Sequence, residues 1–434
     1  MRFIAMMLLV PLTFAGAGCD VAESAAGADA PAAPAPVPNP APRWYKGNLH
    51  THSLWSDGDE FPERSAAWYR DNGYQFLAIS DHNTVQSGDK WVRSADLLKK
   101  GAAKATAAYL RDFADLAQTR GDVASGTYEV RLTPFAEYQP KLERPGQFLL
   151  IQSEEISDRF GDKPIHINAT NITGEPIKPQ GGKSVVEAMR NNFRAVEAQA
   201  KQLNRTIIPH LNHPNFRWGV TAEEIAEVVE DRFFEVFNGH PQVNQEGDET
   251  RPGIDKLWDI ANTLRMTKFK SPPLMGVGTD DSHHYHVTGM NRSTTGRGWI
   301  CVRATSLSTD ALLAAMKQGD FYASSGVSLQ DVQYDRDSKV LKVAIAPAGN
   351  AKFTTRFVGT MAPKAGESVG ADAVGVVFKS VEGLEASYQL TGQELYVRAV
   401  VVSDQDPVNP SYKGQKQQAW TQPVGWEARL NPTP

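Results

Sequence analysis

The chain has 434 residues, 41% of them hydrophobic and 22% charged, which is enough for one large folded domain with smaller segments beside it. Its formal net charge is −5, and it contains no run rich in Lys and Arg. DNA- and RNA-binding proteins usually have a basic patch, so we expect no nucleic acid partner.

Residues 1–18 have the features of a secretory signal peptide: a positive charge at Arg2, an apolar run too short to span a membrane comfortably, and small residues. We therefore expect export to the periplasm. Cys19 follows at the position of a lipoprotein cysteine, but Gly16 stands where such signals usually have Leu. A lipid anchor at Cys19 and ordinary cleavage after Ala17 both stay open.

Residues 19–43 are rich in Ala, Pro and Gly and are predicted to be a disordered linker. From residue 44 to residue 326, strand-like runs alternate with helical stretches, a pattern typical of parallel β/α units. About seven such units predict a closed or nearly closed barrel. The predicted strands are 45–49, 76–80, 148–152, 165–168, 206–209, 234–237 and 274–278, and the predicted helices are 63–72, 91–120, 184–203, 222–229 and 253–264.

Residues 327–434 are predicted to form a small, sandwich-like all-β domain, because β-branched runs alternate with Gly- and Pro-bearing turns. We place strands at 339–345, 353–358, 374–378 and 395–402. The expected fold is thus an α/β barrel followed by a small β domain.

Histidines and carboxylates stand directly after several predicted strands. In a parallel barrel the carboxyl ends of the strands converge on one rim, so these side chains are expected to meet. Gathering them there is costly unless cations compensate, and imidazole with carboxylate suits Mn, Fe or Zn. Each motif alone has an ordinary explanation as a turn or helix cap, but together they predict a metal site. The groups are His50, His52 and Asp57; Asp81 and His82; Glu154 and Glu155; His166; His210 and His213; and Asp280, Asp281 and His283.

The same motifs resemble the PHP (polymerase and histidinol phosphatase) superfamily of metal-dependent hydrolases over residues 44–326. The resemblance lies in Asn48-Leu49-His50-Thr51-His52-Ser53, Ser56-Asp57-Gly58, Asp81-His82, Glu155, Asn212-His213-Pro214 and Asp281-Ser282-His283, in this order. Residues 298–326 are similar to a branch that includes carbaryl-hydrolase-like enzymes and exported phosphoesterases.

The resemblance implies a distorted (β/α)7 barrel with two or three divalent metal ions. One ion would bind His50, His52, Glu155 and Asp281; a second would bind Asp57, His82 and His283; and a third would bind His166 and His213, with Glu155 bridging. Asp57 stands where many members have His, which leaves the identity of the metal open. Glu155 fits the family position better than Glu154, whose side chain is expected to point to the opposite face of the strand.

Paired metals would share a hydroxide that attacks phosphorus in line. Asp281 is expected to serve catalysis as well as metal binding. One of His210, His284 and His286 is expected to protonate the leaving oxygen or hold a non-bridging one, and a role in orienting ligands stays open for them. Asn238, Tyr285, Arg292 and Arg297 are predicted to contact substrate.

Three functions stay open on the sequence. The first is a phosphoesterase, the second a carboxyl-ester or carbamate hydrolase on the same metals, and the third a non-catalytic metal-binding protein. Arg or Lys side chains near the metals would favour the phosphoesterase. Aromatic pocket walls such as Phe216, Trp218 and Tyr285 would favour the carboxyl-ester or carbamate hydrolase. A site with no open coordination position would favour the non-catalytic protein. The sequence says nothing of the oligomeric state.

Overall fold

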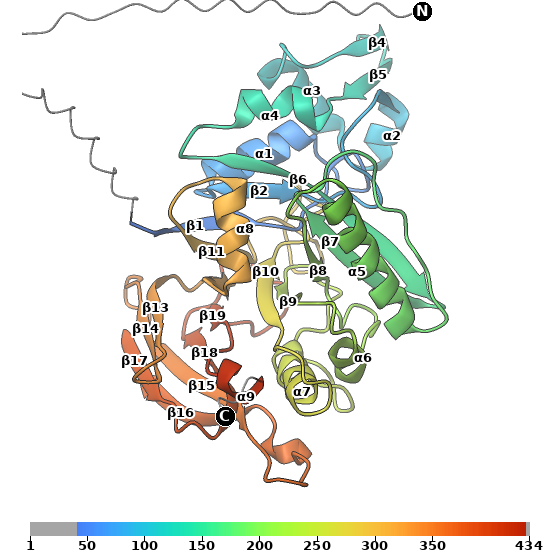
Figure 1. Cartoon of the computed structure of the whole chain (residues 1–434). Coiled ribbons are helices and arrows are strands. Elements are labelled where there is room, and N and C mark those ends of the chain that lie inside the picture. The colour runs from blue at the N-terminus through green and yellow to red at the C-terminus, as the bar shows by residue number, and fades with distance from the viewer. Residues whose placement is uncertain (1–40, 431–434) are drawn as a thin grey trace, which may run out of the picture. The chain divides into compact units, whose positions relative to one another are not determined.

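The computed structural model describes residues 41–430 (Figure 1). The predicted signal peptide, Cys19 and nearly all of the predicted linker lie outside the described residues. No helix in the described part is both long and apolar enough to cross a membrane.

A 13-stranded mixed sheet runs through the described residues and confirms the mixed α/β class. Its order is β10-β9-β8-β7-β6-β2-β1-β11-β12-β19-β18-β15-β16. In that order the strands are β10 (Met275–Thr279), β9 (Phe233–Asn238), β8 (Ile208–Leu211), β7 (Lys163–Thr170), β6 (Leu149–Phe160), β2 (Phe76–Ile79), β1 (Arg43–Asn48), β11 (Trp299–Ala304), β12 (Phe321–Ser324), β19 (Gln418–Thr421), β18 (Glu394–Ser403), β15 (Phe353–Met361) and β16 (Val376–Glu382).

The strand directions differ from a uniform series of parallel units. Strands β1, β2 and β6 are parallel, and so are β8, β9 and β10, but β7 runs antiparallel to both of its neighbours. The cause is the tight β6–β7 hairpin, whose Gly161 has a φ of 63°. Strands β11 and β12 are also antiparallel to their neighbours.

The sheet curls, and its end strand β10 lies against β11 and β12. A Cβ atom on Gly278 would lie only 2.8 Å from the carbonyl oxygen of Trp299. The described strands have no hydrogen-bonded ladder between β10 and β11, so the pairing does not close into a ring. A curled sheet still brings the ends of distant strands toward one another.

Helices cover the curled part of the sheet. Caps mark two of their starts: the Ser184 side chain accepts a hydrogen bond from the Glu187 backbone N–H, and Thr221 with Glu224 forms a capping box. The helices of this part are α1 (Pro62–Asp71), α4 (Phe135–Leu142), α5 (Val185–Gln202), α6 (Ala222–Glu227), α7 (Ile254–Thr267) and α8 (Thr309–Lys317).

The long helix predicted at 91–120 is wrong, because this stretch contains two short helices with strands on either side. The backbone turns at Gly101, whose φ of 77° ends the first helix in the manner of a C-terminal cap. The segment contains β3 (Lys90–Arg93), α2 (Ser94–Lys99), α3 (Ala103–Asp112), β4 (Thr119–Asp122) and β5 (Thr127–Leu132), and its strands form a separate sheet in the order β3-β5-β4.

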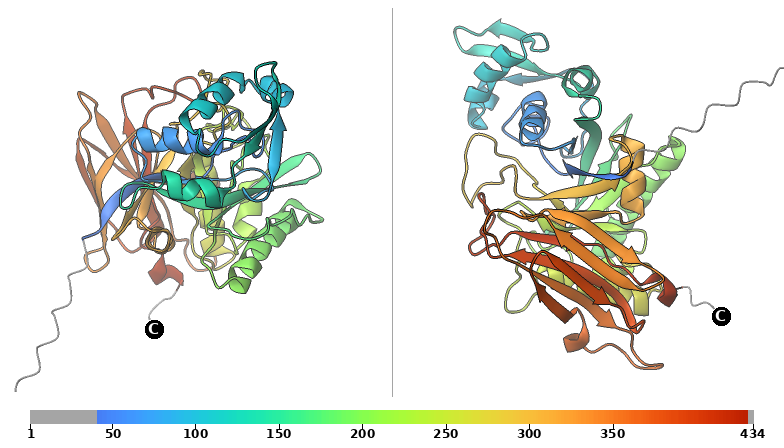
Figure 2. Two further views of the ribbon diagram at one scale, coloured as in Figure 1. Left: turned by 90° about the horizontal axis from the view of Figure 1, so that it is seen from above. Right: turned by 90° about the vertical axis from the view of Figure 1, so that its left-hand side faces the viewer.

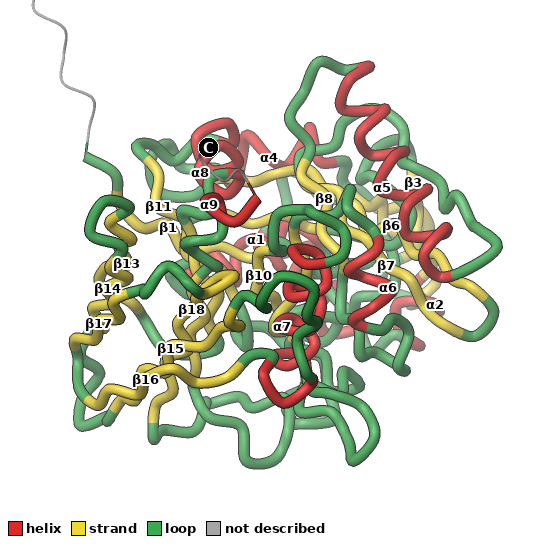
Figure 3. The backbone as a smooth tube through the Cα atoms, turned by 60° about the horizontal axis from the view of Figure 1, so that its bottom comes forward, coloured by secondary structure: helices red, strands yellow, loops and turns green. Residues whose placement is uncertain are grey.

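The C-terminal strands extend the main sheet, because β19 pairs with β12 on one side and with β18 on the other. The other strands of this part, β13 (Leu329–Asp335), β14 (Val340–Ile345) and β17 (Glu385–Gln389), form a three-stranded sheet. The remaining elements are the short η1 (Ala371–Ala373) and α9 (Glu427–Leu430). Figure 2 shows the orange and red strands together on one side of the body, and Figure 3 shows α5 and α6 on the other side.

Candidate metal centre

The backbone itself brings the predicted ligand segments together. Thr51 forms a parallel bridge with Ser282, and His82 forms one with Glu155. The backbone N–H of Asp281 donates to the carbonyl of His50 at 2.9 Å. Segments after β1, β2 and β10 are therefore held beside β6 independently of their side chains.

Glu155 on β6 lies at the centre of the cluster, with five imidazoles within 3.5 Å of its carboxylate oxygens. Its neighbour Glu154 is equally buried but accepts a hydrogen bond from the Ile177 backbone N–H at 2.7 Å, away from the cluster. The nitrogen-to-oxygen distances from Glu155 are 3.4 Å to His50, 3.5 Å to His52, 2.6 Å to His82, 3.0 Å to His166 and 3.4 Å to His213.

A second carboxylate, Asp281, lies just after β10 in a left-handed conformation with a φ of 49°. Its oxygens lie 3.3 Å from Nε2 of His50, 3.1 Å from Nε2 of His52 and 3.6 Å from Nδ1 of His283. Asp281 and Glu155 are both almost fully buried. Two buried carboxylates thus face the same pair of imidazoles, His50 and His52.

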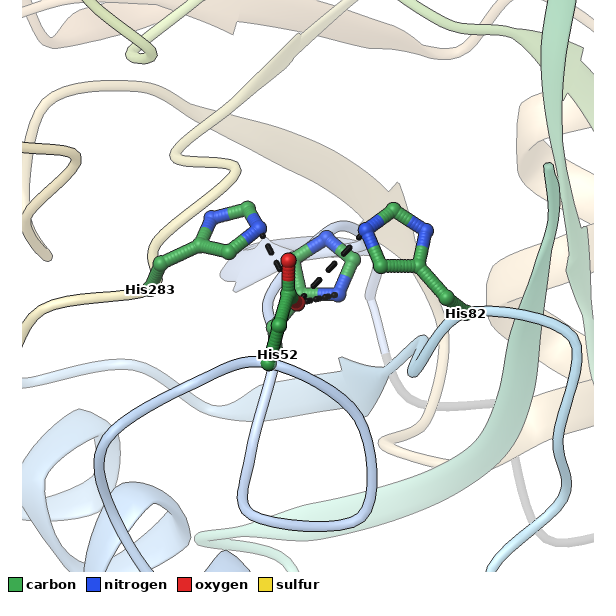
Figure 4. Close-up of side chains that lie close together, drawn as sticks. His52, His82 and His283 are labelled. Atoms are coloured by element: carbon green, nitrogen blue, oxygen red, sulfur yellow. Dashed lines mark ion pairs between the residues drawn. The ribbon is translucent and has the colours of Figure 1, made fainter. Parts of the chain in front are cut away.

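The third carboxylate, Asp57, marks the solvent-facing edge, since its side chain is 57% exposed. It lies 3.8 Å from His52, 3.5 Å from His82 and 3.3 Å from His283. Figure 4 shows the three imidazoles turned toward one another. His52 therefore borders both this group and the buried group around Asp281, whereas the family resemblance assigns it to the buried group alone.

The donor chemistry fits divalent cations. Four sets of at least three His, Asp and Glu residues have their donor atoms within 4.8 Å of one another in the described residues. These nitrogens and oxygens suit Mn, Fe or Zn. The four sets are His52, Asp57, His82 and His283; His50, His52 and Asp281; His50, His210 and Glu235; and His82, Glu155 and His166.

The mutual electrostatics of the cluster are strong. Burial alone would raise the pKa of Glu155, but His82, His166 and His50 outweigh it and hold that pKa well below its usual range. Burial alone would lower the pKa of His82, but the carboxylates of Glu155 and Asp57 raise it to about 11. A buried, ionised carboxylate needs positive charge beside it. Bound cations can supply this charge in place of the protons on the imidazoles.

Sequence reasoning missed Glu235, a fully buried carboxylate on β9. Its oxygens lie 2.7 Å from Nδ1 of His50 and accept hydrogen bonds from the His213 backbone N–H at 2.7 Å and from Asn238 at 2.7 Å. The Thr279 hydroxyl donates to it at 2.6 Å. The available signal was one carboxylate inside the otherwise apolar run Phe233–Phe237.

His210 lies behind the cluster rather than at its open edge. It is fully buried, and its Nε2 atom lies 3.7 Å from Glu235. Burial lowers its pKa despite the nearby carboxylate. This position favours the alternative that His210 orients ligands, and its catalytic role stays a prediction.

The predicted substrate contacts Asn238 and Arg297 both hydrogen-bond to groups of the protein. The Asn238 amide donates to Glu235 and, at 3.2 Å, to Asp281. Arg297 is buried and donates to the carbonyls of Gly239 at 2.8 Å and Gly289 at 2.9 Å, besides those of Arg292 and Asn409. Both side chains thus have a structural role, and a contact of either with substrate stays a prediction.

The remaining candidates lie on the loop after β10. The Tyr285 hydroxyl is directed inward, where it hydrogen-bonds the Thr51 hydroxyl at 2.7 Å and donates to the carbonyl of His52 at 3.0 Å, so it fixes the loop that holds His52. His284 is half-buried, with Nδ1 3.3 Å from the Ser293 carbonyl. Arg292 is exposed.

No protein-family model and no curated protein matches this chain. Among solved structures, it is similar to a two-domain protein from Bacteroides vulgatus containing a predicted PHP-like metal-dependent phosphoesterase. The TM-score is 0.41 and the identity 15%, over 89% of this chain and 97% of that chain. It is also similar to a candidate metal-dependent phosphoesterase from Bifidobacterium adolescentis, with a TM-score of 0.29 and 14% identity over 55% of this chain and 87% of that chain. Both likenesses are weak.

Proposed function

We propose that this chain is an exported metal-dependent hydrolase of the PHP type that cleaves phosphoesters. The observation that supports this most is the position of Glu155, a buried carboxylate with five imidazoles within 3.5 Å. The curled sheet around this cluster would correspond to the distorted barrel that the motifs imply. Two or three ions of Mn, Fe or Zn would fit the donors.

The exposure of the cluster is graded, which favours catalysis over storage. His50, His52 and Glu155 have no exposed side-chain surface, whereas His82 is 27% and Asp57 57% exposed. The buried side can hold ions tightly while the other side admits substrate and water, and catalytic metal sites keep such an open position.

Two groups of residues would have separate roles at the metal site. Divalent cations bound there would supply a water with its pKa lowered to about 7 and positive charge for the developing oxyanion. His50, His52 and Asp281 would fix the buried donors. Asp57, His82 and His283 would hold donors at the edge where the ester arrives.

A carboxyl-ester or carbamate hydrolase is the second candidate, because a metal-activated water also attacks a carbonyl carbon. Phe216 favours it by placing an aromatic ring 5.0 Å from the ring of His213. The class of ester therefore has to be measured rather than inferred from the metal donors.

The test combines elemental analysis with a substrate panel. Purified protein should contain Mn, Fe or Zn, lose activity on chelation and regain it when metal is returned. The panel should include p-nitrophenyl phosphate, bis(p-nitrophenyl) phosphate, p-nitrophenyl acetate and an aryl carbamate. Hydrolysis of the last two alone would replace the proposal with the second candidate.

A matched pair of variants tests the site. We expect Glu155→Gln to lose bound metal and nearly all activity, because the amide has no negative charge to offer the cations. Glu154→Gln should keep both, since its side chain faces away from the cluster. Equal metal content in the two variants would show that Glu155 is no ligand.

Export and the state of Cys19 rest on the sequence alone. The mass of the protein isolated from its native envelope fraction distinguishes a lipidated N-terminus at Cys19 from cleavage after Ala17. A retained Met1 would contradict export by this signal.

A further inference from the structure

The turn that follows β8 has an unusual backbone. Three of its non-glycine residues have positive φ angles: 25° at His213, 49° at Arg217 and 57° at Trp218. Such conformations are strained for residues with a side chain and persist only where the surroundings impose them. They also concentrate at functional sites, so the surroundings of this turn are informative.

The segment at 243–252 holds the turn in place. The Asn215 side chain is buried and donates to the carbonyls of Asn244 and Pro252 at 3.0 Å each. The Asn244 amide donates back to the carbonyl of Asn215 at 3.0 Å. Phe216 also forms an antiparallel bridge with Val243. The turn is therefore a rigid element.

The turn presents an aromatic ring beside the metal centre. The Phe216 ring centroid lies 5.0 Å from that of His213, 5.5 Å from that of His240 and 6.5 Å from that of His166. Phe216 is only half-buried. One part of its ring thus packs against the site, and another part remains available.

Arg217 adds a cation next to this ring. Its guanidinium carbon lies 5.2 Å from the centroid of Phe216, and the residue is exposed. It forms no ion pair within the described residues, unlike Arg251 of the same region, which lies 3.9 Å from Asp248. The Arg217 guanidinium therefore has no ion-pair partner among the described residues, and it lies over the same Phe216 ring that packs near His213.

We propose that Phe216 and Arg217 form the substrate-recognition part of the metal site. Phe216 packs against a flat ring on the alcohol side of the ester, and Arg217 pairs with an anionic oxygen. Guanidinium groups match phosphate oxygens in geometry and charge. The substrate class is a phosphoester of an aromatic or similarly flat alcohol, an assignment that rests on the proposed function.

The test compares Arg217→Ala, Arg217→Lys and Phe216→Ala on p-nitrophenyl phosphate and p-nitrophenyl acetate. We expect Arg217→Ala to raise KM for the phosphate about tenfold with little change in kcat. The lost contact would bind the substrate and the transition state equally well. Arg217→Lys should recover part of the loss, and KM for the neutral acetate should stay the same. Phe216→Ala should raise KM for both aryl esters. Metal content should be unchanged in all three.

Arg356→Ala, which removes another exposed arginine, on β15, is the control and should leave KM unchanged. An unchanged KM in Arg217→Ala, with the wild type active on p-nitrophenyl phosphate, would overturn this inference and leave the proposed function standing. So would a rise in KM in Arg292→Ala alone.

Binding of inorganic phosphate to the metal-loaded protein decides the inference even if no phosphoester is cleaved. Calorimetry should show weaker phosphate binding to Arg217→Ala than to the wild type, by about tenfold. Equal affinity would refute the role of Arg217. Hydrolysis of p-nitrophenyl acetate alone would refute the proposed phosphoesterase while phosphate binding still reports on Arg217.

Discussion

Glu235 shows how one residue can position ligands from several strands. It contacts the ring of His50, the backbone of His213 and the amide of Asn238, which in turn reaches Asp281. A carboxylate on Nδ1 of a histidine fixes the tautomer that leaves Nε2 free for a metal. Glu235 therefore supports His50 in this role without facing the open edge.

We predict that Glu235→Gln lowers metal affinity about 10- to 100-fold while the protein stays folded. The amide cannot accept from all of its present donors, so His50 and Asn238 lose their fixed orientation. Metal titration followed by competition with a chelator measures the change, and circular dichroism checks the fold.

Thr279→Val is the milder comparison, because it removes only one of the donors to Glu235. We expect its metal affinity to lie between those of the wild type and Glu235→Gln. Wild-type affinity in Glu235→Gln would refute the positioning role.

At the scale of elements, the site depends on how closely β10 approaches β11. Glycine occurs where the two strands come close. A Cβ atom on Gly278 would lie 2.8 Å from the Trp299 carbonyl, and one on Gly298 would lie 2.4 Å from the Thr279 carbonyl. Backbone atoms cannot give way as a flexible side chain can. The absence of side chains here lets β10 bring Asp281 toward the segment after β1.

We predict that Gly278→Ala destabilises the protein by about 1–3 kcal/mol and weakens metal binding, because β10 must move away from β11. Gly370→Ala is the control, since a Cβ atom there would meet no atom within 4 Å. Denaturant unfolding of the metal-free proteins measures stability, and equal midpoints for the two variants would contradict the prediction.

At the scale of the whole molecule, a buried ion pair joins the C-terminal strands to the helical part. Arg398 on β18 is 1% exposed and donates to Asp259 of α7 at 2.8 Å and 3.0 Å. The Tyr396 hydroxyl donates to the same carboxylate at 2.8 Å. Together with the pairing of β19 between β12 and β18, this contact makes the C-terminal strands part of one body.

We predict that the chain from residue 41 unfolds in a single calorimetric transition rather than in two. Arg398→Ala should lower the stability of that transition by about 3–5 kcal/mol, because Asp259 is left buried without its partner. Arg356→Ala on the exposed face of β15 should change it little. Two separate transitions in the wild type would show that residues 327–434 fold independently.

Much of the local structure could be predicted from the sequence. The predicted strands at 234–237 and 274–278 correspond to β9 and β10, and the predicted helix at 184–203 corresponds to α5. The residue types of the cluster could also be recognised locally, since His50, His82 and Asp281 each stand shortly after a predicted strand. The spacing of hydrophobic residues and the residue types are properties of a short segment. They can therefore be recognised without knowing which strand the segment pairs with.

Strand direction and pairing could not be predicted in the same way. A strand of alternating apolar and polar residues such as β7 has the same pattern whether its neighbour is parallel or antiparallel. The four-residue strand β19 joins the main sheet far along the chain from β12, its neighbour. The helix expected at 91–120 was interrupted because a left-handed glycine and pairing with β5 outweighed helical periodicity.

The sequence by itself determined which donor atoms this protein has and that they follow strands. Only the tertiary structure decided that Glu155 lies within 3.5 Å of five imidazoles, that Glu235 contacts His50, and that the Arg297 guanidinium donates to carbonyl groups. The physical reason is that donor chemistry belongs to single residues, whereas distance, burial and the availability of a side chain arise from backbone segments that meet only in the folded chain.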